Sequence, residues 1–473
     1  MASLPDGDKN GSKSGDGEQE PNKMIQTDHA PPGQNLAFAT QAIHADDDDH
    51  LGLGLGRTTA TDDDVAPPMH VSTTFRYARD PDELAPVADP ASAAAAAAAE
   101  KHIYSRWTAP NSTRLERVLS TLLRGRALTY ASGLAAYHAA LVYLNPKRVA
   151  IGEGYHGCHG VLSIHRKLTG SQQLPLDCPA SDLAEGDLIH LETPLNPTGE
   201  AFSIAKYAEK AHSRGAYLLV DATFGPPGLQ DPFEWGADMV MHSGTKYLGG
   251  HSDMLCGVLA TKRDDWFWGL WEERGHLGNV MGSFEGWLGI RSLRTLELRV
   301  QRQSENAAAL VHWLHALLRP DSTEGTGGTS RDASGQKGAI GGSEGGSLSE
   351  DKPIAVRNVV QGVLHASVQA DGQDGENGKK GWLKEQMPNG GGPVFAILLK
   401  SEAFAKRLPS RLALFHHATS LGGVESLIEW RKMSDPKTDP RLVRVSVGVE
   451  RYEDLRDDFL QAFRSLAEEV ETA

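Results

Sequence analysis

The sequence predicts an α/β fold, in which a large domain with a mostly parallel sheet is followed by a smaller α+β domain. Short apolar stretches alternate with amphipathic ones between residues 101 and 300, as in parallel strands joined by crossover helices. One of these stretches, 216–221 (AYLLVD), is apolar almost throughout, which is typical of a strand covered on both faces. After about Gln301 the alternation gives way to a long helix, several strands and a closing helix, which indicates the second domain.

The elements of the large domain follow from the periodicity of apolar residues. A helix with an apolar face is expected at 132–144, and an amphipathic helix at 203–215 with Gly215 as its C-terminal cap. On the second helix, apolar residues recur with the spacing of one helical face: Ile204, Tyr207, Ala208 and Ala211. Strands are expected at 127–131, 148–154, 187–194, 216–221, 237–244 and 255–262.

The second domain begins with a predicted helix at 304–319 and closes with another at 452–470. Strands are expected between them at 356–369, 393–400 and 442–448. The resulting division of the chain is a disordered tail (1–34), an N-terminal arm with low-complexity inserts (35–100), the large domain (101–300) and the C-terminal domain (301–473). Glycine- and serine-rich insertions are expected within the last of these at about 319–352 and 370–380.

Composition restricts the class of protein. The 473 residues carry a formal charge of −15, which argues against binding to a nucleic-acid backbone or an anionic membrane surface. No apolar run approaches the roughly 20 residues needed to span a bilayer, and the polar N-terminus lacks the apolar region of a signal peptide. The three cysteines are widely spaced and match no zinc or disulfide pattern, so a reduced, cytoplasmic location is expected.

Polar side chains follow most of the predicted strands of the large domain. In an open α/β sheet, ligands bind outside the carboxyl ends of the strands. The residues expected at this edge are Ser132 and Gly133, Tyr155, Asn196, Asp221 and Thr223, and Thr245 and Lys246. Taken singly, each has a simpler interpretation, because a glycine can form a turn, an aspartate can cap one and a lysine is usually solvated. Their shared position at one edge favours a binding site.

This set of groups suits pyridoxal phosphate (PLP). A helix N-terminus binds the phosphate, and a lysine amine condenses with the aldehyde as a Schiff base. A carboxylate keeps the pyridine nitrogen protonated, so that the ring becomes an electron sink, and an aromatic side chain stacks on the ring.

The motif 242–253 (HSGTKYLGGHSD) resembles the cofactor-lysine signature of the cystathionine γ-lyase/γ-synthase family, the PLP-dependent trans-sulfuration enzymes of cysteine and methionine metabolism. The resemblance continues, in family order, through other segments: PPMHVSTTF (67–75), YSR (104–106), ASGLAA (131–136), ETPLNPTG (192–199), VDATF (220–224), SLRTLELR (292–299), SLGGVESL (420–427) and VRVSVGVE (443–450). It implies the type I PLP-dependent transferase fold, with a mostly parallel seven-stranded sheet.

The resemblance also implies roles for individual residues. Lys246 is expected to bind the cofactor and then carry protons, Asp221 to pair with the pyridine nitrogen, and Tyr155 to stack on the ring and assist the leaving group. Arg444 is expected to bind the substrate α-carboxylate beside Ser420. The other expected cofactor contacts are Ser132, Gly133, Leu134, Asn196 (also near the substrate), Thr223, Ser243 and Thr245. Tyr104 and Arg106 are expected to reach the phosphate of a neighbouring subunit, which implies a homodimer within a homotetramer.

Three departures from the family pattern bear on the substrate. Ile103 and Thr419 stand where γ-lyases of the family carry glutamates that frame the distal amine of cystathionine. Ala109 interrupts the usual sequence after YSR, and Trp430 and Arg431 lie near the expected substrate entrance.

No metal site is predicted. His156, Cys158 and His159 follow Tyr155, but PLP chemistry needs no metal, and packing is the expected role of Cys158. The acidic 44–50 segment is expected to be a solvated loop. The glycine-rich 52–57 segment lacks the spacing of a dinucleotide-binding motif.

The leading functional hypothesis is a PLP-dependent carbon–sulfur lyase that acts on cystathionine or a related thioether amino acid by α-proton abstraction and β- or γ-elimination. An alternative is γ-replacement, in which O-acylhomoserine and cysteine give cystathionine. A third is a PLP-binding homologue without turnover. The sequence does not choose between β- and γ-elimination.

Overall fold

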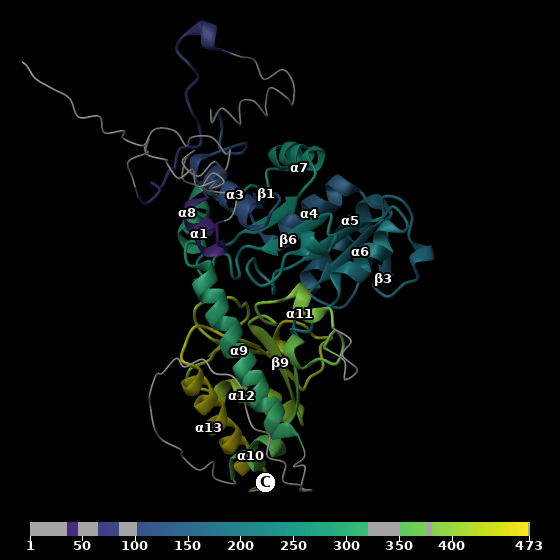
Figure 1. Cartoon of the computed structure of the whole chain (residues 1–473), viewed down its shortest axis with the longest axis vertical. Coiled ribbons are helices and arrows are strands. Elements are labelled where there is room, and N and C mark those ends of the chain that lie inside the picture. The colour runs from purple at the N-terminus through teal and green to yellow at the C-terminus, as the bar shows by residue number, and fades with distance from the viewer. Residues whose placement is uncertain (1–35, 46–64, 85–101, 320–350, 375–380, 472–473) are drawn as a thin grey trace, which may run out of the picture.

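The computed structural model describes five ranges of the chain: 36–45, 65–84, 102–319, 351–374 and 381–471. These residues form two lobes joined by a long helix, α9 (Figure 1). The predicted tail, the low-complexity inserts at 46–64 and 85–100, and most of the two glycine-rich insertions lie outside the described residues. Within the described ranges, every helix is too short or too polar to cross a bilayer.

The large domain is built on a seven-stranded sheet, which confirms the predicted α/β fold. Its strands are β1 (Arg126–Tyr130), β2 (Arg148–Ile151), β3 (Gln172–Pro175), β4 (Leu188–Glu192), β5 (Tyr217–Asp221), β6 (Met239–Ser243) and β7 (Gly257–Thr261). Their order across the sheet is β1-β7-β6-β5-β4-β2-β3. Strand β7 is antiparallel to both its neighbours, and the pairs from β6 to β3 are parallel.

Helices cover both faces of this sheet, because alternate residues of each strand point to opposite sides. On β5, Leu218 and Val220 belong to one apolar core, whereas Leu219 belongs to the other. The first core is closed mainly by α3 (Pro110–Leu122), α6 (Ile204–His212) and α8 (Ser283–Leu293), with α1 (Phe38–His44) beside them. The second is closed by α4 (Gly133–Leu144), α5 (His156–Thr169) and α7 (Asp264–Leu277). The apolar run predicted at 216–221 is therefore buried on both sides.

The C-terminal domain packs helices on a second, five-stranded sheet. Its strands are β8 (Val360–Leu364), β9 (Val394–Leu399), β10 (His416–His417), β11 (Leu427–Trp430) and β12 (Leu442–Ser446), in the order β10-β11-β12-β9-β8. Only the β10–β11 pair is parallel. Its helices are α10 (Asp351–Val359), α11 (Leu383–Gln386), α12 (Glu402–Arg411) and α13 (Tyr452–Glu471). Single 3-10 turns occur at Pro81–Glu83, Ala180–Asp182, Pro232–Trp235, Ala366–Val368 and Arg431–Met433.

Helix α9 (Leu296–Leu318) crosses the domain boundary that the sequence places at residue 300. Leu296 and Val300 are buried in the core of the large domain, whereas Leu310 and Leu314 are buried in that of the C-terminal domain. Figure 1 shows this helix running from one lobe into the other. One continuous element therefore fixes the two sheets relative to each other, and with them the two halves of the cavity described below.

Three sequence-based expectations need correction. The helix predicted at 304–319 begins two turns earlier, at Leu296, and is α9. The strand predicted at 356–369 begins only at Val360, because the preceding residues are the last turn of α10, where Val356 and Val359 are both buried. The helix predicted at 203–215 ends at His212, and Ser213 rather than Gly215 is its cap. Gly215 instead has a φ of 67° in the turn that follows, a conformation that glycine adopts without strain.

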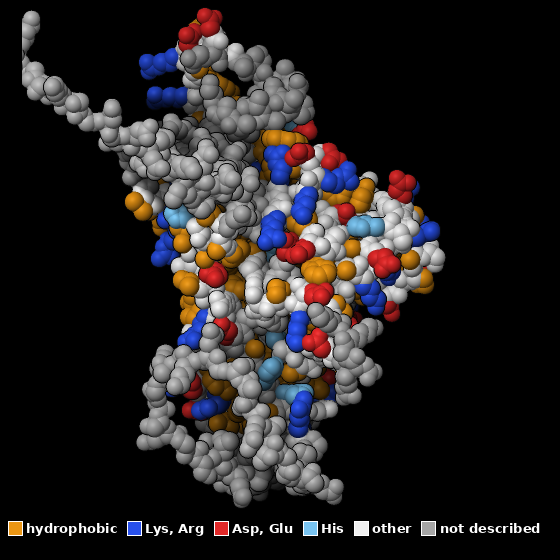
Figure 2. Space-filling model, viewed as in Figure 1, with side chains coloured by type: hydrophobic (Ala, Val, Ile, Leu, Met, Phe, Trp, Pro, Cys, Tyr) orange, Lys and Arg blue, Asp and Glu red, His pale blue; other side chains and the backbone are white. Residues whose placement is uncertain are grey.

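Strand β3 was not predicted, because its sequence QQLP lacks an apolar pattern. It lies at the edge of the sheet, pairs only with β2, and leaves most of its side chains exposed. Figure 2 shows acidic and basic side chains intermixed over this face of the large domain. The described surface in this view is thus of mixed charge.

Candidate active site

A cavity of about 380 Å³ lies where the carboxyl ends of the parallel strands face the C-terminal domain. Both domains contribute to its wall. The lining residues are Ser132, Gly133, Leu134, Tyr155, His156, Glu192, Asn196, Asp221, Thr223, Phe224, Met241, Ser243, Thr245, Lys246, Leu255, Thr419, Ser420, Leu421, Arg431, Ser434 and Arg444. The strand-end groups that the sequence singled out are therefore brought together in one space.

Lys246 lies in the turn that follows β6, and its amine points at the C-terminal domain. Its Nζ donates a hydrogen bond to Ser420 Oγ at 2.6 Å. Burial, together with the positive charge of Arg444, lowers the pKa of Lys246 to about 8. A substantial fraction of this amine is therefore neutral, and able to act as a nucleophile or base, near neutral pH.

The turn that carries Ser420 passes directly over the backbone of Lys246. Gly422 in this turn has a φ of 86°, and a Cβ atom there would lie 2.8 Å from the Lys246 carbonyl carbon and from Tyr247 N. Only glycine allows this approach. Ser420 itself has a φ of 78°, which is uncommon for a residue with a side chain. The backbone is thus held in an unfavourable conformation at the residue that contacts the lysine amine.

Asp221 ends β5 and is buried. Its Oδ1 accepts hydrogen bonds from Thr223 N at 3.0 Å and Thr223 Oγ1 at 2.5 Å. Burial raises the pKa of Asp221 to about 6, although the bonds from Thr223 oppose this effect. In the part of the chain that the structure describes, no lysine, arginine or histidine forms a salt bridge with this carboxylate. The site therefore presents a buried carboxylate that lacks a cationic partner.

The N-terminus of α4 forms another part of the cavity wall. Ser132 caps this helix through a bond from Ala135 N to Ser132 Oγ at 3.1 Å. Gly133 and Leu134, whose N–H groups belong to the first turn of the helix, line the cavity. A Cβ atom on Gly133 would lie 3.1 Å from Ser243 Cβ, so glycine permits the close approach of α4 to β6. Thr245 also faces the cavity. These groups can bind an anion such as a phosphate.

Glu192 is a residue of the site that the sequence interpretation missed. Its buried carboxylate accepts hydrogen bonds from Tyr155 N and Asn196 N, each at 2.8 Å. Glu192 thereby ties together the loops that follow β2 and β4 and places both side chains at the cavity. Burial and the neighbouring Asp221 raise the pKa of Glu192 to about 8. The available signal was an acid at the end of an otherwise apolar strand, LIHLE.

Arg444 lies on β12 and is also buried. One Nη donates to Asn196 Oδ1 at 3.1 Å, and the other donates to the Ser420 carbonyl at 2.8 Å and to Glu429 Oε2 at 2.7 Å. Burial lowers its pKa to about 10, so it stays charged at neutral pH. Arg431, which the sequence places near the substrate entrance, lines this side of the cavity. Glu429, which was not among the predicted site residues, bonds to both arginines.

Tyr104 and Arg106 do not line this cavity. Tyr104 is 42% exposed and pairs with Thr74 through an isolated β-bridge. Arg106 donates a hydrogen bond to the Gly275 carbonyl at 2.6 Å and lies 5.5 Å from the rings of Tyr104 and Trp107. Neither residue therefore contributes to the cavity of its own chain.

The departures from the family pattern have distinct structural consequences. Thr419 lines the cavity and Ile103 does not. Ala109 is buried as the N-cap of α3, with Pro110 as the first residue of that helix. This is a favourable position for proline, because the missing N–H would have no partner there.

His156, Cys158 and His159 do not converge. All three lie in the first turn of α5, but His156 faces the cavity, Cys158 is buried, and His159 lines a separate depression. Cys158 instead lies close to His190 and Asp221, with the three potential ligand atoms within 4.8 Å of one another. The cysteine packs behind the carboxylate that faces the cavity.

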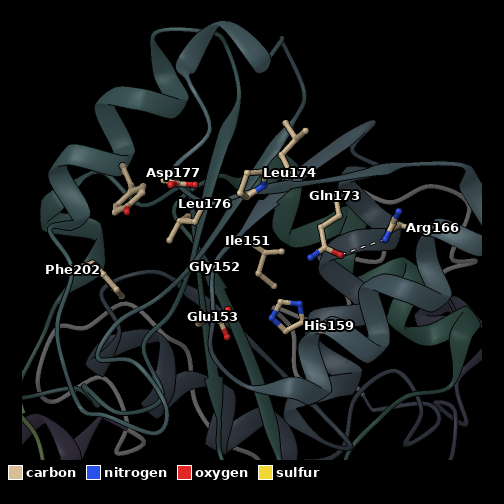
Figure 3. Close-up of a pocket in the computed structure, with 12 residues that line it drawn as sticks. Ile151, Gly152, Glu153, His159, Arg166, Gln173, Leu174, Leu176, Asp177 and Phe202 are labelled. Carbon is tan, nitrogen blue, oxygen red and sulfur yellow. Dashed lines mark hydrogen bonds between the residues drawn. The ribbon is translucent and has the colours of Figure 1, made fainter. Parts of the chain in front are cut away.

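The separate depression has about 710 Å³ of space near the outer edge of the large sheet (Figure 3). In this view, His159 and an Arg166–Gln173 hydrogen bond of 3.4 Å lie on one side, and Asp177 and Phe202 lie on the other. Its lining residues include no lysine. We therefore place the candidate active site in the smaller cavity, where Lys246 and Asp221 meet.

The sequence matches the family described as "Cys/Met metabolism PLP-dependent enzyme" over residues 50–319 and 376–464. Cystathionine gamma-lyase of Saccharomyces cerevisiae is 30% identical over 451 residues, which cover 90% of this chain and 97% of that protein. Cystathionine gamma-synthase of Haemophilus influenzae is 28% identical over 77% of this chain and 87% of its own length. Cystathionine beta-lyase MetC of Bacillus subtilis is 28% identical over 77% of this chain and 86% of its own length.

Solved structures give the same result. The crystal structure of metB from Corynebacterium glutamicum has a TM-score of 0.70 and 26% identity, and covers 91% of this chain and 98% of that one. The crystal structure of cystathionine gamma-lyase from yeast has a TM-score of 0.69 and 26% identity, with the same coverage. The two structures share the fold of this chain, and the names of the three relatives above state three different reactions.

Proposed function

Because the chain belongs to the Cys/Met metabolism family of PLP-dependent enzymes, we propose that it is a carbon–sulfur lyase acting on cystathionine or a related thioether amino acid. The reaction would remove the α-proton and eliminate a thiol at the β or γ carbon. The observation that carries this proposal is the placement of Lys246, Asp221 and Arg444 around one cavity. These groups suit the three requirements of the chemistry: a base, a cofactor partner and a carboxylate-binding cation.

The residues of the cavity fit PLP. Asp221 supplies the buried carboxylate that a protonated pyridine nitrogen needs, and it has no competing cation in the described chain. The N-terminus of α4, with Ser243 and Thr245, can hold the phosphate. Lys246 would hold the cofactor covalently through Nζ. Tyr155 and Asn196, placed by Glu192, would contact the ring and its oxygen.

When bound, PLP supplies an electron sink for the charge that develops at the substrate Cα. Arg444 would bind the α-carboxylate with its fork of donors, and Asn196 and Ser420 would hold that guanidinium in place. This orientation would present the Cα proton to Lys246, whose neutral Nζ can accept it. The amine is held by Ser420 Oγ at 2.6 Å, so its position is fixed before the proton moves.

The electrons of the broken carbon–sulfur bond leave with sulfur, and the thiolate needs a proton. Tyr155 is suited to supply it, because desolvation raises the pKa of its phenol and keeps it protonated. Its side chain is 38% exposed and lies at the cavity wall, where a leaving group could reach it. The proton that Lys246 has taken up would pass through solvent to the Tyr155 phenolate, which would restore both groups before the next turnover.

The lowered pKa of Lys246 predicts how the apoprotein takes up PLP. Only the neutral amine attacks the aldehyde, and with a pKa of about 8 roughly a quarter of it is neutral at pH 7.5. The rate of covalent attachment, followed by the change in PLP absorbance, should rise with pH to a midpoint near 8. A midpoint near 10.5, the pKa of an ordinary lysine, would contradict the described environment of this amine.

Incubation with L-cystathionine tests the proposed reaction. Release of a keto acid is expected: pyruvate with homocysteine indicates β-elimination, and 2-oxobutyrate with cysteine indicates γ-elimination. Formation of cystathionine from O-acylhomoserine and cysteine, without keto acid from cystathionine, would favour the γ-replacement alternative instead. A PLP-loaded protein that forms none of these products would contradict both and favour a homologue without turnover.

We also propose a homodimer or homotetramer with shared sites. Tyr104 and Arg106 lie outside the cavity of their own chain, and 42% of Tyr104 is exposed. They are therefore available to a second copy, and their cation and hydroxyl would suit its phosphate. A cytoplasmic location is supported by the three cysteines, which are buried and free.

A further inference from the structure

Two buried arginines share one glutamate beside the cavity. Glu429 on β11 lies directly opposite Arg444 on β12 in the antiparallel register. Arg431 follows Glu429 by two residues and begins the 3-10 turn directly after β11. Glu429 Oε2 accepts hydrogen bonds from Arg431 Nη1 and from an Nη of Arg444, each at 2.7 Å. The result is a row of cation, anion and cation.

This row carries an excess positive charge that is shielded from solvent. The exposed fractions of Arg431, Glu429 and Arg444 are 4%, 2% and 4%. Burial alone would raise the pKa of Glu429, but the two guanidiniums lower it, so the carboxylate is ionised at neutral pH. Within this row, one carboxylate faces two permanent cations, which leaves a net positive charge that is costly to bury. Glu192 and Asp435 lie within electrostatic range of Arg431, but in the described chain its salt bridge is to Glu429. An anion bound at this place would compensate the net positive charge.

The two arginines differ in how far their donors are used. Arg444 bonds to three acceptors: Asn196, the Ser420 carbonyl and Glu429. For Arg431 the one bond recorded within the described chain goes to Glu429, and its buried Nε has no partner there. Arg431 nevertheless lines the cavity. A buried guanidinium with unused donors at a cavity wall is a site for a carboxylate.

We propose that Arg431 binds a second, distal carboxylate of the substrate, and so selects thioether amino acids with an anionic end over uncharged ones. This inference rests on the proposed lyase function and names its substrate class. Arg444 takes the α-carboxylate, and Arg431 takes the carboxylate at the far end of the side chain. Arg431 is thus a specificity residue and takes no part in proton transfer.

The same cavity offers little to a distal ammonium group. Thr419 contributes a hydroxyl, and Ile103 lies outside the lining. The carboxylate of Glu192 is already bonded to two backbone N–H groups, and that of Asp221 to Thr223. Recognition of the distal end therefore falls to Arg431, through charge and a two-point hydrogen bond.

A pair of unreactive ligands tests the subsite in the PLP-loaded enzyme. 3,3′-Thiodipropionate has two carboxylates and no amine, whereas 3-(methylthio)propionate has one carboxylate. Calorimetric titration should give a dissociation constant at least about 10-fold lower for the diacid in the wild-type protein. Arg431→Gln should weaken diacid binding by about 10- to 100-fold and change monoacid binding by less than about 3-fold. For Arg431→Lys, which keeps the charge but loses the planar fork of donors, the dissociation constant of the diacid should lie between those of the wild type and Arg431→Gln.

A matched control is Arg441→Gln, which removes an exposed arginine from the same strand region, where it pairs with Asp439. It should leave both affinities unchanged. Equal affinity of the wild type for diacid and monoacid, or equal losses of both in Arg431→Gln, would overturn the proposal. The cofactor absorption spectrum and the melting temperature of each variant show whether the site remains folded, since Glu429 keeps its bond to Arg444.

Turnover gives an independent readout. With L-cystathionine, Arg431→Gln should raise KM by about 10-fold or more and change kcat by less than about 3-fold. The reason is that the lost contact stabilises the bound substrate and the transition state equally. With S-propyl-L-homocysteine or S-propyl-L-cysteine, both constants should stay unchanged. If the wild type releases keto acid from none of these, the lyase function fails, while the titrations still decide the carboxylate subsite.

Discussion

Replacement of Lys246 by alanine should lower kcat/KM by at least about 10³-fold. The amine is the group placed to hold PLP and to accept the Cα proton, and general acid–base catalysis alone contributes about 10²- to 10⁴-fold. The variant should also lose the absorption of covalently bound PLP, although the helix N-terminus and Asp221 would still bind the free cofactor. Keto-acid release and the absorption spectrum together measure this result.

Lys262→Ala is the matched control, because Lys262 is an exposed lysine just beyond β7 and remote from the cavity lining. It should retain wild-type turnover and spectrum. Addition of a small primary amine should restore a fraction of the activity of Lys246→Ala by replacing the missing base. Turnover by Lys246→Ala within 10-fold of the wild type would show that another group performs the proton transfer.

The second large effect is expected for Asp221→Asn. An asparagine at this position can still accept the bonds from Thr223, but it has no charge to stabilise a protonated pyridine nitrogen. Loss of one such electrostatic interaction should reduce kcat by about 10²- to 10³-fold. The loss should appear in kcat more than in KM, since Arg444 still binds the substrate carboxylate.

The same substitution, which lowers activity, should not lower the free energy of unfolding of the apoprotein. Folding raises the pKa of Asp221 from its ordinary value of 3.8 to about 6, so ionisation is less favourable in the folded apoprotein than in the unfolded chain. The carboxyl therefore lowers the free energy of unfolding as pH rises from about 4 to about 6, and this loss persists above pH 6. Asp221→Asn removes the loss, so the apo-variant should be at least as stable as the wild-type apoprotein at pH 7.5.

Urea unfolding of both apoproteins at pH 4 and pH 7.5 measures this difference. Relative to the wild type, the variant should gain stability between the two values. A variant that is inactive and also markedly destabilised at pH 7.5 would indicate that the carboxylate supports the fold rather than the cofactor.

Much of the large domain could be predicted from sequence, because its strands are buried on both faces and its helices have one apolar side. Strand β5 and helix α4 are examples, and the strand-end rule then located Lys246, Asp221 and Asn196. The edge strand β3 could not be found in this way, since a strand with one neighbour and exposed side chains needs no apolar pattern.

The start of the C-terminal sheet was misassigned for a related reason. The residues VRNVV suit the alternation of a strand, but Val356 and Val359 are buried on one side of α10, next to the strand that begins at Val360. Short segments with several valines fit either periodicity, and only tertiary packing decides between them. Elements of this length lie at the limit of what the sequence determines.

The row of Arg431, Glu429 and Arg444 could not have been recognised before the strand register was known. Glu429 and Arg444 are opposed only because β11 pairs antiparallel with β12 in one particular register. A shift by one residue would turn Glu429 to the other face of the sheet. The sequence thus indicates the residue types at the substrate entrance, and the fold determines which of them form ion pairs with one another.

Helix α9 has a consequence for how the molecule comes apart. Its 23 residues form one hydrogen-bonded rod of roughly 35 Å, whose first turns complete one apolar core and whose last turns complete the other. Unfolding of either core would unwind the part of α9 that packs against it. The unwinding would expose apolar residues of the other core to solvent. The two lobes should therefore melt cooperatively, and cleavage of the chain at residue 300 would yield two fragments that each expose apolar surface, rather than two autonomous folding units.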